Sequence, residues 1–131
     1  MFDRKKQPAI KSLIAQGSSI EGHCRFTDGL RIDGEVVGDV TAHADSTSIL
    51  VVSESARITG AVVADHVIVN GTVLGPIRAS QLLELQPKAR VEGDVQYKAL
   101  EMHQGALITG QLRPLMPGEE KPTLKLAANN A

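Results

Sequence analysis

A short unit that ends in Ile or Val, a polar residue and glycine recurs along the chain, and no other feature constrains the fold as strongly. Four segments align without gaps: AQGSSIEG (15–22), SESARITG (53–60), QPKARVEG (86–93) and HQGALITG (103–110). A second unit occurs twice, as IDGEVVGDV (32–40) and VNGTVLGPI (69–77). Such self-similarity is the signature of a repeat architecture, in which each unit packs against its neighbours along the chain.

The spacing of the repeat sets the size of one coil. One glycine per unit gives Gly22, Gly38, Gly60, Gly75, Gly93 and Gly110, separated by 16, 22, 15, 18 and 17 residues. The longest step contains the polar run DSTS at 45–48, which we interpret as a four-residue insertion at one corner. Without it a coil has about 17 residues, too few for a helix-containing repeat of ~33 residues. A coil of this length suits three short strands joined by tight corners.

Apolar and polar side chains alternate within each unit. Ile32, Val36 and Val40 would point to one face and the charged residues between them to the other, which is the period of a half-buried strand. Aromatic residues make up only 2% of the chain, so the core must be narrow and filled by rows of aliphatic side chains. We therefore predict an all-β, single-domain, triangular parallel β-solenoid over residues 13–113. A hairpin turn at Asn70-Gly71 would instead give an antiparallel meander, but the other units carry Glu, Asp or Thr before the glycine.

The two flanks differ from the repeat region. Residues 1–11 carry four basic and one acidic side chain (+3), and residues 12–112 carry seven basic and twelve acidic ones (−5). We predict that residues 1–12 form a disordered basic tail and residues 114–131 a disordered tail with proline, which cannot donate to a strand ladder. An acidic body repels phosphate backbones, so no nucleic-acid partner is expected. One cysteine and no signal-peptide or membrane-spanning run predict a cytoplasmic protein.

The residues that most often carry chemistry show no catalytic or metal-binding spacing. His23, His43, His66 and His103 form no His-x-His or His-x-x-x-His pair, and no Cys-x-x-Cys occurs. Cys24 stands at an inward position and is interpreted as a small buried hydrophobe. No serine lies in a Gly-x-Ser-x-Gly context and no glycine-rich phosphate loop occurs. The sequence therefore predicts no enzymatic activity, no cofactor and no metal site.

The two ends of the solenoid are the candidate functional site. Terminal coils expose unpaired strand edges and the last layer of the core, and solenoids that stay monomeric cover them with a cap. Neither flank has the character of a cap, so we expect molecules to stack end to end into a filament. The apolar residues expected at this contact are Leu13, Ile14, Ile20, Phe26, Ile108, Leu112 and Leu115.

The extreme N-terminus suggests a membrane-surface anchor. Met1 and Phe2 form an apolar tip, and the cations Arg4, Lys5 and Lys6 follow. The tip would enter the bilayer interface while the cations approach anionic lipids. One copy would bind weakly, but a filament displays many copies and gains avidity.

These features together resemble the bactofilins, a bacterial family of polymer-forming cytoskeletal proteins. The resemblance covers residues 13–113 and lies in the Val/Ile-x-Gly-x-Val units, the doublets at 32–40 and 69–77, and the segments at 56–60 and 89–93. It implies a right-handed triangular β-helix of about six coils, which assembles without nucleotide into filaments joined through the terminal coils. It also implies a scaffold on the cytoplasmic face of the inner membrane, with an N-terminal membrane-targeting motif, that organises cell shape or peptidoglycan-remodelling enzymes.

Two other readings of a β-solenoid are open. A capped protein-binding module would act as a discrete dimer and would need a folded companion domain, for which these 131 residues leave no room. A hexapeptide-type β-helix enzyme would need an apolar residue at nearly every sixth position and a catalytic or zinc-binding histidine set. The glycine pairs four residues apart and the isolated histidines count against it.

Overall fold

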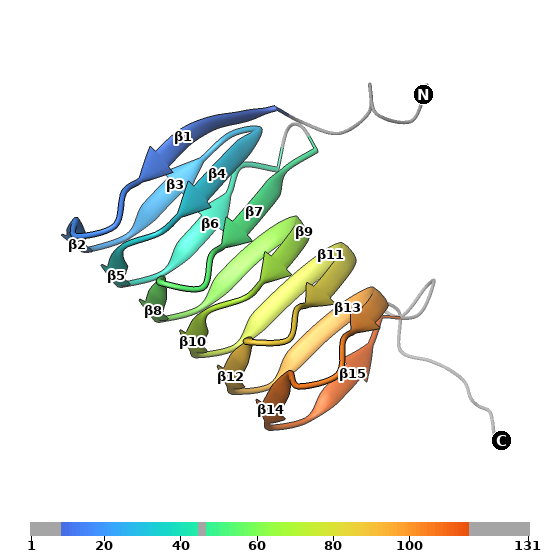
Figure 1. Cartoon of the computed structure of the whole chain (residues 1–131). Coiled ribbons are helices and arrows are strands. Elements are labelled where there is room, and N and C mark those ends of the chain that lie inside the picture. Colours follow the sequence, from blue (N-terminus) through green and yellow to red (C-terminus); the bar gives the residue numbers. More distant parts are fainter. Residues whose placement is uncertain (1–8, 45–46, 116–131) are drawn as a thin grey trace, which may run out of the picture.

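The computed structural model describes residues 9–44 and 47–115, which form fifteen strands and no helix. The strands wind as stacked coils with three flat faces, here called faces A, B and C (Figure 1). Every strand pairing is parallel, and each strand pairs with the strand of the next coil on the same face. The prediction of an all-β parallel solenoid of about six coils is therefore confirmed.

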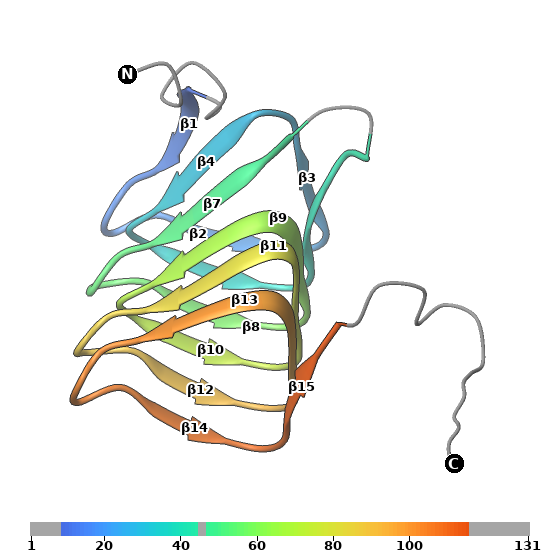
Figure 2. The same cartoon turned by 90° about the vertical axis from the view of Figure 1, so that its right-hand side faces the viewer.

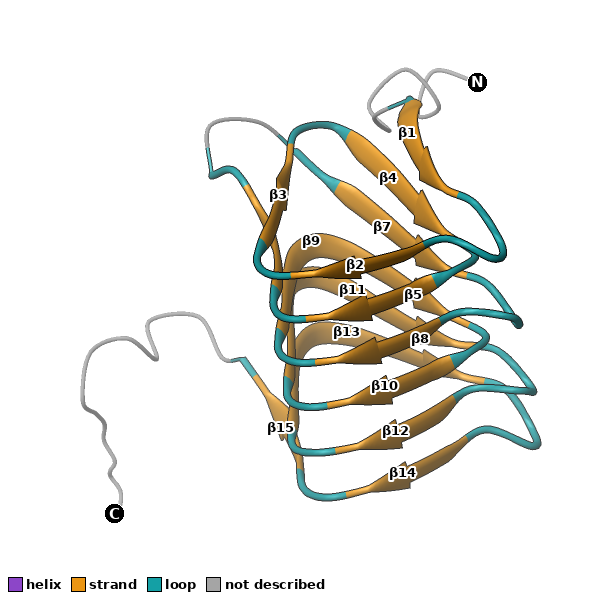
Figure 3. Ribbon diagram, turned by 90° about the vertical axis from the view of Figure 1, so that its left-hand side faces the viewer, coloured by secondary structure: helices purple, strands orange, loops and turns teal. Residues whose placement is uncertain are grey.

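Each face contains six stacked strand segments; face A is a six-stranded sheet, and faces B and C belong to one nine-stranded sheet. Face A contains β2 (Ser19–Glu21), β5 (Glu35–Val37), β8 (Arg57–Thr59), β10 (Thr72–Leu74), β12 (Arg90–Glu92) and β14 (Leu107–Thr109) (Figure 3). Face B contains β3 (Cys24–Phe26), β6 (Val40–Ala42), the first parts of β9 (Val62–Val69), β11 (Ile77–Leu85) and β13 (Val95–Met102), and β15 (Leu112–Pro114). Face C contains β1 (Ile10–Ile14), β4 (Gly29–Ile32), β7 (Ile49–Val52) and the second parts of β9, β11 and β13.

The core consists of aliphatic columns that run along the solenoid axis. On face A the inward column is Ile20, Val36, Ile58, Val73, Val91 and Ile108. In parallel register each member lies on the equivalent residue of the next coil, ~4.8 Å away. The members between the two end coils are buried. The alternation read from the sequence thus places the middle residue of each face A strand inside, and stacked aliphatic side chains rather than large rings fill the core.

The corner between faces B and C contains the insertion. Seven residues separate Thr41 from Ile49 in this corner. The equivalent corner has two residues in β9, between Val63 and His66, and three in β11, between Arg78 and Leu82. The corner is therefore longer by four or five residues, against the four expected from the spacing. Ser48 closes the insertion and is buried; its backbone N–H donates to Asp65 Oδ2 at 3.0 Å. The Ser80 hydroxyl donates to the other oxygen of the same carboxylate. Asp65 therefore fixes the corner after the insertion.

The predicted tails fall mostly outside the described residues. Residues 1–8 and 116–131 are not described, so their predicted disorder stays a prediction. β1 begins at Ile10, inside the stretch predicted as the N-terminal tail, because this segment pairs with β4. Ala9 and Leu115 both lie at the corner between faces B and C, at opposite ends of the stack. Within the described ranges there is no helix long and apolar enough to cross a bilayer.

Candidate functional site

The two end faces of the solenoid present strand edges without a partner. Within residues 9–44 and 47–115, the outer edges of β1, β2 and β3 pair with no other strand. The same is true of β14, β15 and the second part of β13 at the other end (Figure 2). Each end is thus a triangle of unpaired N–H and C=O groups, which is a template for another chain.

At the N-terminal end, Ile14, Ile20 and Cys24 form the outermost inner layer. All three are half-buried and begin inward columns that continue in the next coil. Ile14 pairs with Ile32, and Ile20 pairs with Val36. Ile14 and Cys24 also pack against the core. Ile14 and Ile20 therefore lie in the N-terminal end layer; their part in a contact between molecules stays a prediction.

Leu13 and Phe26 are placed differently from the other expected contact residues. Leu13 pairs with Arg31 in an outward column of face C and is 58% exposed on the side of the solenoid. Two consecutive strand residues point to opposite faces, so Leu13 cannot join Ile14 in the inner layer. Phe26 is only 7% exposed and belongs to the core. Its ring fits inside because Ala42, its partner in the next coil, is small.

At the C-terminal end the last layer is more exposed. Ile108 is half-buried and packs against the core, and Leu112 is 44% exposed although it ends an inward column. Leu115 is half-buried, and its backbone N–H donates to the Tyr97 carbonyl oxygen. Leu112 is the sixth member of a column whose fifth member, Val95, is fully buried. Its exposure therefore comes only from the absence of a following coil among the described residues.

The sequence analysis missed two members of this last layer. Leu100 pairs with Leu83, and Met102 pairs with Leu85, so both end inward columns; Met102 is 45% exposed. Each lies 17 residues after its partner, so the coil length read from the sequence would have predicted both positions. Covering the apolar surface of such residues stabilises an association by ~25 cal/mol per Å². The C-terminal end is thus an apolar surface bordered by unpaired strand edges.

Comparison with protein-family models gives a match to Bactofilin, described as polymer-forming cytoskeletal, over residues 12–113. The chain belongs to the bactofilin family. Comparison with curated proteins and with solved structures gave no match. The bactofilin match covers the solenoid itself, and it makes the protein a member of a cytoskeletal, polymer-forming family. The expected membrane-targeting residues Met1, Phe2, Arg4, Lys5 and Lys6 lie outside the described residues.

The histidines and the cysteine of this bactofilin are exposed or half-buried. His23, His43 and His103 are exposed and His66 is half-buried. Burial raises the pKa of the Cys24 thiol, which disfavours the reactive thiolate. Cys24, interpreted from the sequence as a small buried hydrophobe, is half-buried and packs against the core in the N-terminal end layer.

Coil stacking brings together one cluster that the sequence did not predict. Side-chain donor atoms of Glu84, Glu101 and His103 lie within 4.8 Å of one another on face C. His103 Nε2 is 3.3 Å from Glu84 Oε2. These groups could share a cation or a proton, and they are partly open to solvent. A search for metal-binding spacings within one sequence segment does not reveal the cluster. Glu84 and His103 are 19 residues apart and come together only because their two coils stack.

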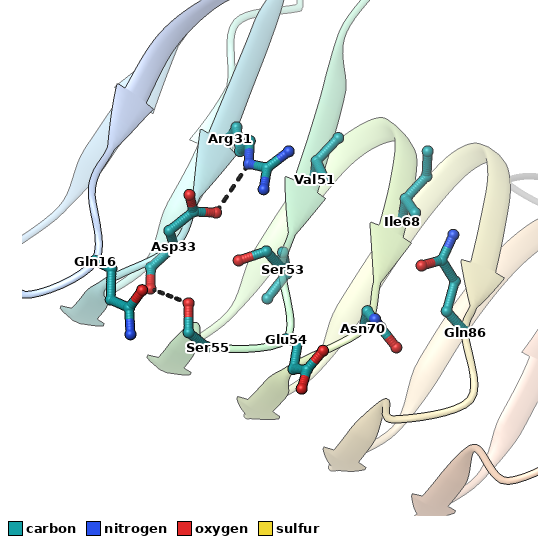
Figure 4. A pocket seen from close by; sticks show the side chains of 11 residues that line it. Gln16, Arg31, Asp33, Val51, Ser53, Glu54, Ser55, Ile68, Asn70 and Gln86 are labelled. Carbon is teal, nitrogen blue, oxygen red and sulfur yellow. Dashed lines mark hydrogen bonds and ion pairs between the residues drawn. The ribbon is translucent and has the colours of Figure 1, made fainter.

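A shallow groove follows face C towards its corner with face A (Figure 4). Its volume is about 560 Å³, and it is lined by Gln16, Arg31, Asp33, Val51, Val52, Ser53, Glu54, Ser55, Ile68, Asn70 and Gln86. Arg31 Nε donates to Asp33 Oδ1 at 2.9 Å, and the Ser55 hydroxyl donates to the Asp33 backbone carbonyl at 2.8 Å. The Ser53 hydroxyl and the Arg31 guanidinium lower the pKa of the Asp33 carboxyl. The groove is thus polar, with an ion pair at one end.

Proposed function

We propose that this bactofilin forms filaments by end-to-end stacking of its coils and that assembly needs no nucleotide. The observation that supports this is the way the inward columns end. Leu112 and Met102 are 44% and 45% exposed, whereas their column neighbours Val95 and Leu85 are fully buried. A second molecule stacked on this end would bury these side chains and pair the free strand edges.

Nucleotide independence follows from the nature of this contact. Burial of aliphatic side chains and pairing of strand edges are both favourable without a chemical step. The sequence carries no glycine-rich phosphate loop that would couple hydrolysis to assembly. Assembly should therefore proceed at a sufficient protein concentration without added nucleotide.

The filament is proposed to act as a scaffold on the cytoplasmic face of the inner membrane. Met1 and Phe2, with Arg4, Lys5 and Lys6, would supply a weak anchor in each molecule. Many anchors on one filament would bind together with high avidity. Such a membrane-bound polymer could organise cell shape or position peptidoglycan-remodelling enzymes.

Negative-stain electron microscopy and ultracentrifuge pelleting test the proposal directly. The purified protein, without nucleotide or metal, should form thin unbranched filaments that pellet. A stable monomer or dimer at high concentration would contradict end-to-end assembly and would favour a capped binding module. Deleting residues 1–6 should release the polymer from anionic vesicles without changing pelleting in their absence; unchanged vesicle binding would contradict the anchor.

A further inference from the structure

The three faces of the solenoid carry different charges. The outward positions of face B are Arg25, Thr41, Val63, Arg78, Gln96 and Arg113. The strand segments of this face thus contain three cations and no carboxylate. The strands of face A contain Glu21, Glu35, Arg57, Arg90 and Glu92, and those of face C contain Lys11, Arg31, Glu84 and Glu101. Among the described residues, face B is therefore the one face whose outward column carries positive charge alone.

The guanidinium groups of face B are available to an external anion. All three arginines are exposed, and none of them makes an ion pair within residues 9–44 and 47–115. Arg78 Nη1 donates to Gln96 Oε1 at 3.0 Å, and Arg113 Nη2 donates to Gln111 Oε1 at 2.8 Å. A guanidinium has five N–H donors, so most of them stay free. By contrast, cations outside face B are paired with carboxylates. Lys11 pairs with Asp28, at the corner between faces B and C, and Arg31 and Lys88 pair with Asp33 and Glu54.

Acidic side chains border face B only at its corners. Asp39 Oδ1 and Asp94 Oδ1 each accept a backbone N–H of the following coil, from Ala61 and Gln111, at 2.9 Å. Asp65 is bonded to Ser48 and Ser80 in the opposite corner, where Lys98 adds a further cation. These carboxylates are committed to the chain's own donors. The flat middle of the face keeps its positive charge.

The arginines are arranged to meet a flat surface. Outward residues of adjacent strands are ~4.8 Å apart, and Arg25 and Arg113 belong to the first and last strands of the face. The cations therefore span the full length of the solenoid. Ala9, where the N-terminal segment joins the described residues, lies against Gly29 at the corner that borders this face.

We propose that face B is the side of the solenoid that docks on a bilayer containing anionic lipids. Arg25, Arg78 and Arg113 would donate to the phosphate oxygens of the headgroups, for which a guanidinium is well suited. The inference rests on the proposed polymer, because three cations per molecule bind weakly and a filament multiplies them. It assigns the membrane side of the filament to a face of the folded domain, separate from the N-terminal residues.

Vesicle flotation with matched double variants tests this assignment. The probes are phosphatidylcholine vesicles with and without phosphatidylglycerol, and the protein is the full chain. R25Q/R78Q removes two charges from face B, and the control R57Q/R90Q removes two from face A. We expect R25Q/R78Q to reduce the fraction floated with anionic vesicles roughly fivefold or more, and R57Q/R90Q to reduce it much less. R25K/R78K keeps the charge but not the guanidinium geometry, and should retain more of the flotation than R25Q/R78Q.

Any other flotation result contradicts the docking face. Equal losses in the two glutamine variants would mean that only net charge matters, and no loss would mean that the N-terminal residues act alone. Equal flotation with neutral vesicles, or release from the lipid by RNA at low concentration, would point to a different ligand. Electron microscopy of all four proteins without vesicles reports on assembly separately. Absent filaments together with a selective loss in R25Q/R78Q would contradict the polymer and leave the docking face in place.

Discussion

Gly60 lies directly against Gly38 of the preceding coil, and the Gly38 carbonyl oxygen leaves no room for a Cβ on Gly60. Gly60 also has a φ of +154°, a conformation that residues with a side chain rarely adopt. Gly75, Gly93 and Gly110 repeat the same contact with the glycine one coil earlier. The recurring glycine is therefore required twice, by the backbone conformation and by the close approach of the coils.

Replacing Gly60 with alanine should destabilise the solenoid strongly. The added Cβ must move a backbone carbonyl and also adopt a strained φ, and together these should lower the free energy of unfolding by about 3 kcal/mol or more. Urea denaturation followed by circular dichroism measures the change. Gly17→Ala is the matched control, because Gly17 has a φ of +92° but no atom within 4 Å of the added Cβ. It should cost only about 1–2 kcal/mol, and equal losses would mean that the contact with Gly38 is unimportant.

Leu112→Arg should weaken assembly without unfolding the protein. Leu112 ends an inward column and is 44% exposed, so the substitution places a charge in the end contact but leaves the monomer core intact. The critical concentration measured by pelleting should rise about tenfold or more, equivalent to ~1.4 kcal/mol. Circular dichroism should be unchanged.

Val37→Arg is the control for that substitution. Val37 is 43% exposed, nearly the same as Leu112, but lies in an outward column of face A. Its critical concentration should stay within about twofold, since isolated surface substitutions change free energies by about 0.5 kcal/mol or less. Assembly lost in both variants, or in Val37→Arg alone, would place the contact on the sides of the solenoid.

The sequence predicted the columns well, because parallel stacking carries one residue pattern from coil to coil. Val36 and Ile58 fall at equivalent places in their repeat units and form one column. The sequence analysis was wrong where the direction of a side chain depends on how its strand pairs with the next coil. Leu13 and Ile14 are equally apolar, and the pairing of Ile14 with Ile32, beyond a register shift between Ile10 and Ser12, decides which of them points inward.

Phe26 shows the same limit for packing. The sequence places it in the first coil but does not give the space beneath it, which depends on Ala42 in the next coil. The ring is buried in the single molecule, so Phe26→Arg is expected to unfold the first coil rather than to act on assembly alone. The cluster of Glu84, Glu101 and His103 could not be predicted from the sequence either, because its members come together only when the coils stack.

Asp33 should make stability sensitive to acid. The Ser53 hydroxyl and the Arg31 guanidinium lower the pKa of its carboxyl, so the ionised form is favoured in the folded state. The resulting stability is present above the unfolded pKa of about 3.9 and is lost as the pH falls through the folded pKa. The ion pair of Arg31 and Asp33 lies near the surface, so its contribution to the free energy of unfolding should not exceed about 1 kcal/mol. Asp33→Asn should lose less stability than the unmodified protein between neutral pH and pH ~3 in urea denaturation; identical pH profiles would contradict the role of Asp33.

Cys24 can report on the end contact, since it is the only cysteine of the chain. It is half-buried in the N-terminal end layer, and no strand covers that side of β3 within the described ranges. Burial already raises the pKa of its thiol, and a stacked second molecule would also block access to it. Maleimide labelling should therefore slow several-fold when the protein passes from monomer to filament.

Thr59→Cys in a Cys24→Ala background places a thiol on the side of face A and should label at the same rate in both states. A Cys24 labelling rate that does not change on assembly would contradict a contact through the N-terminal end.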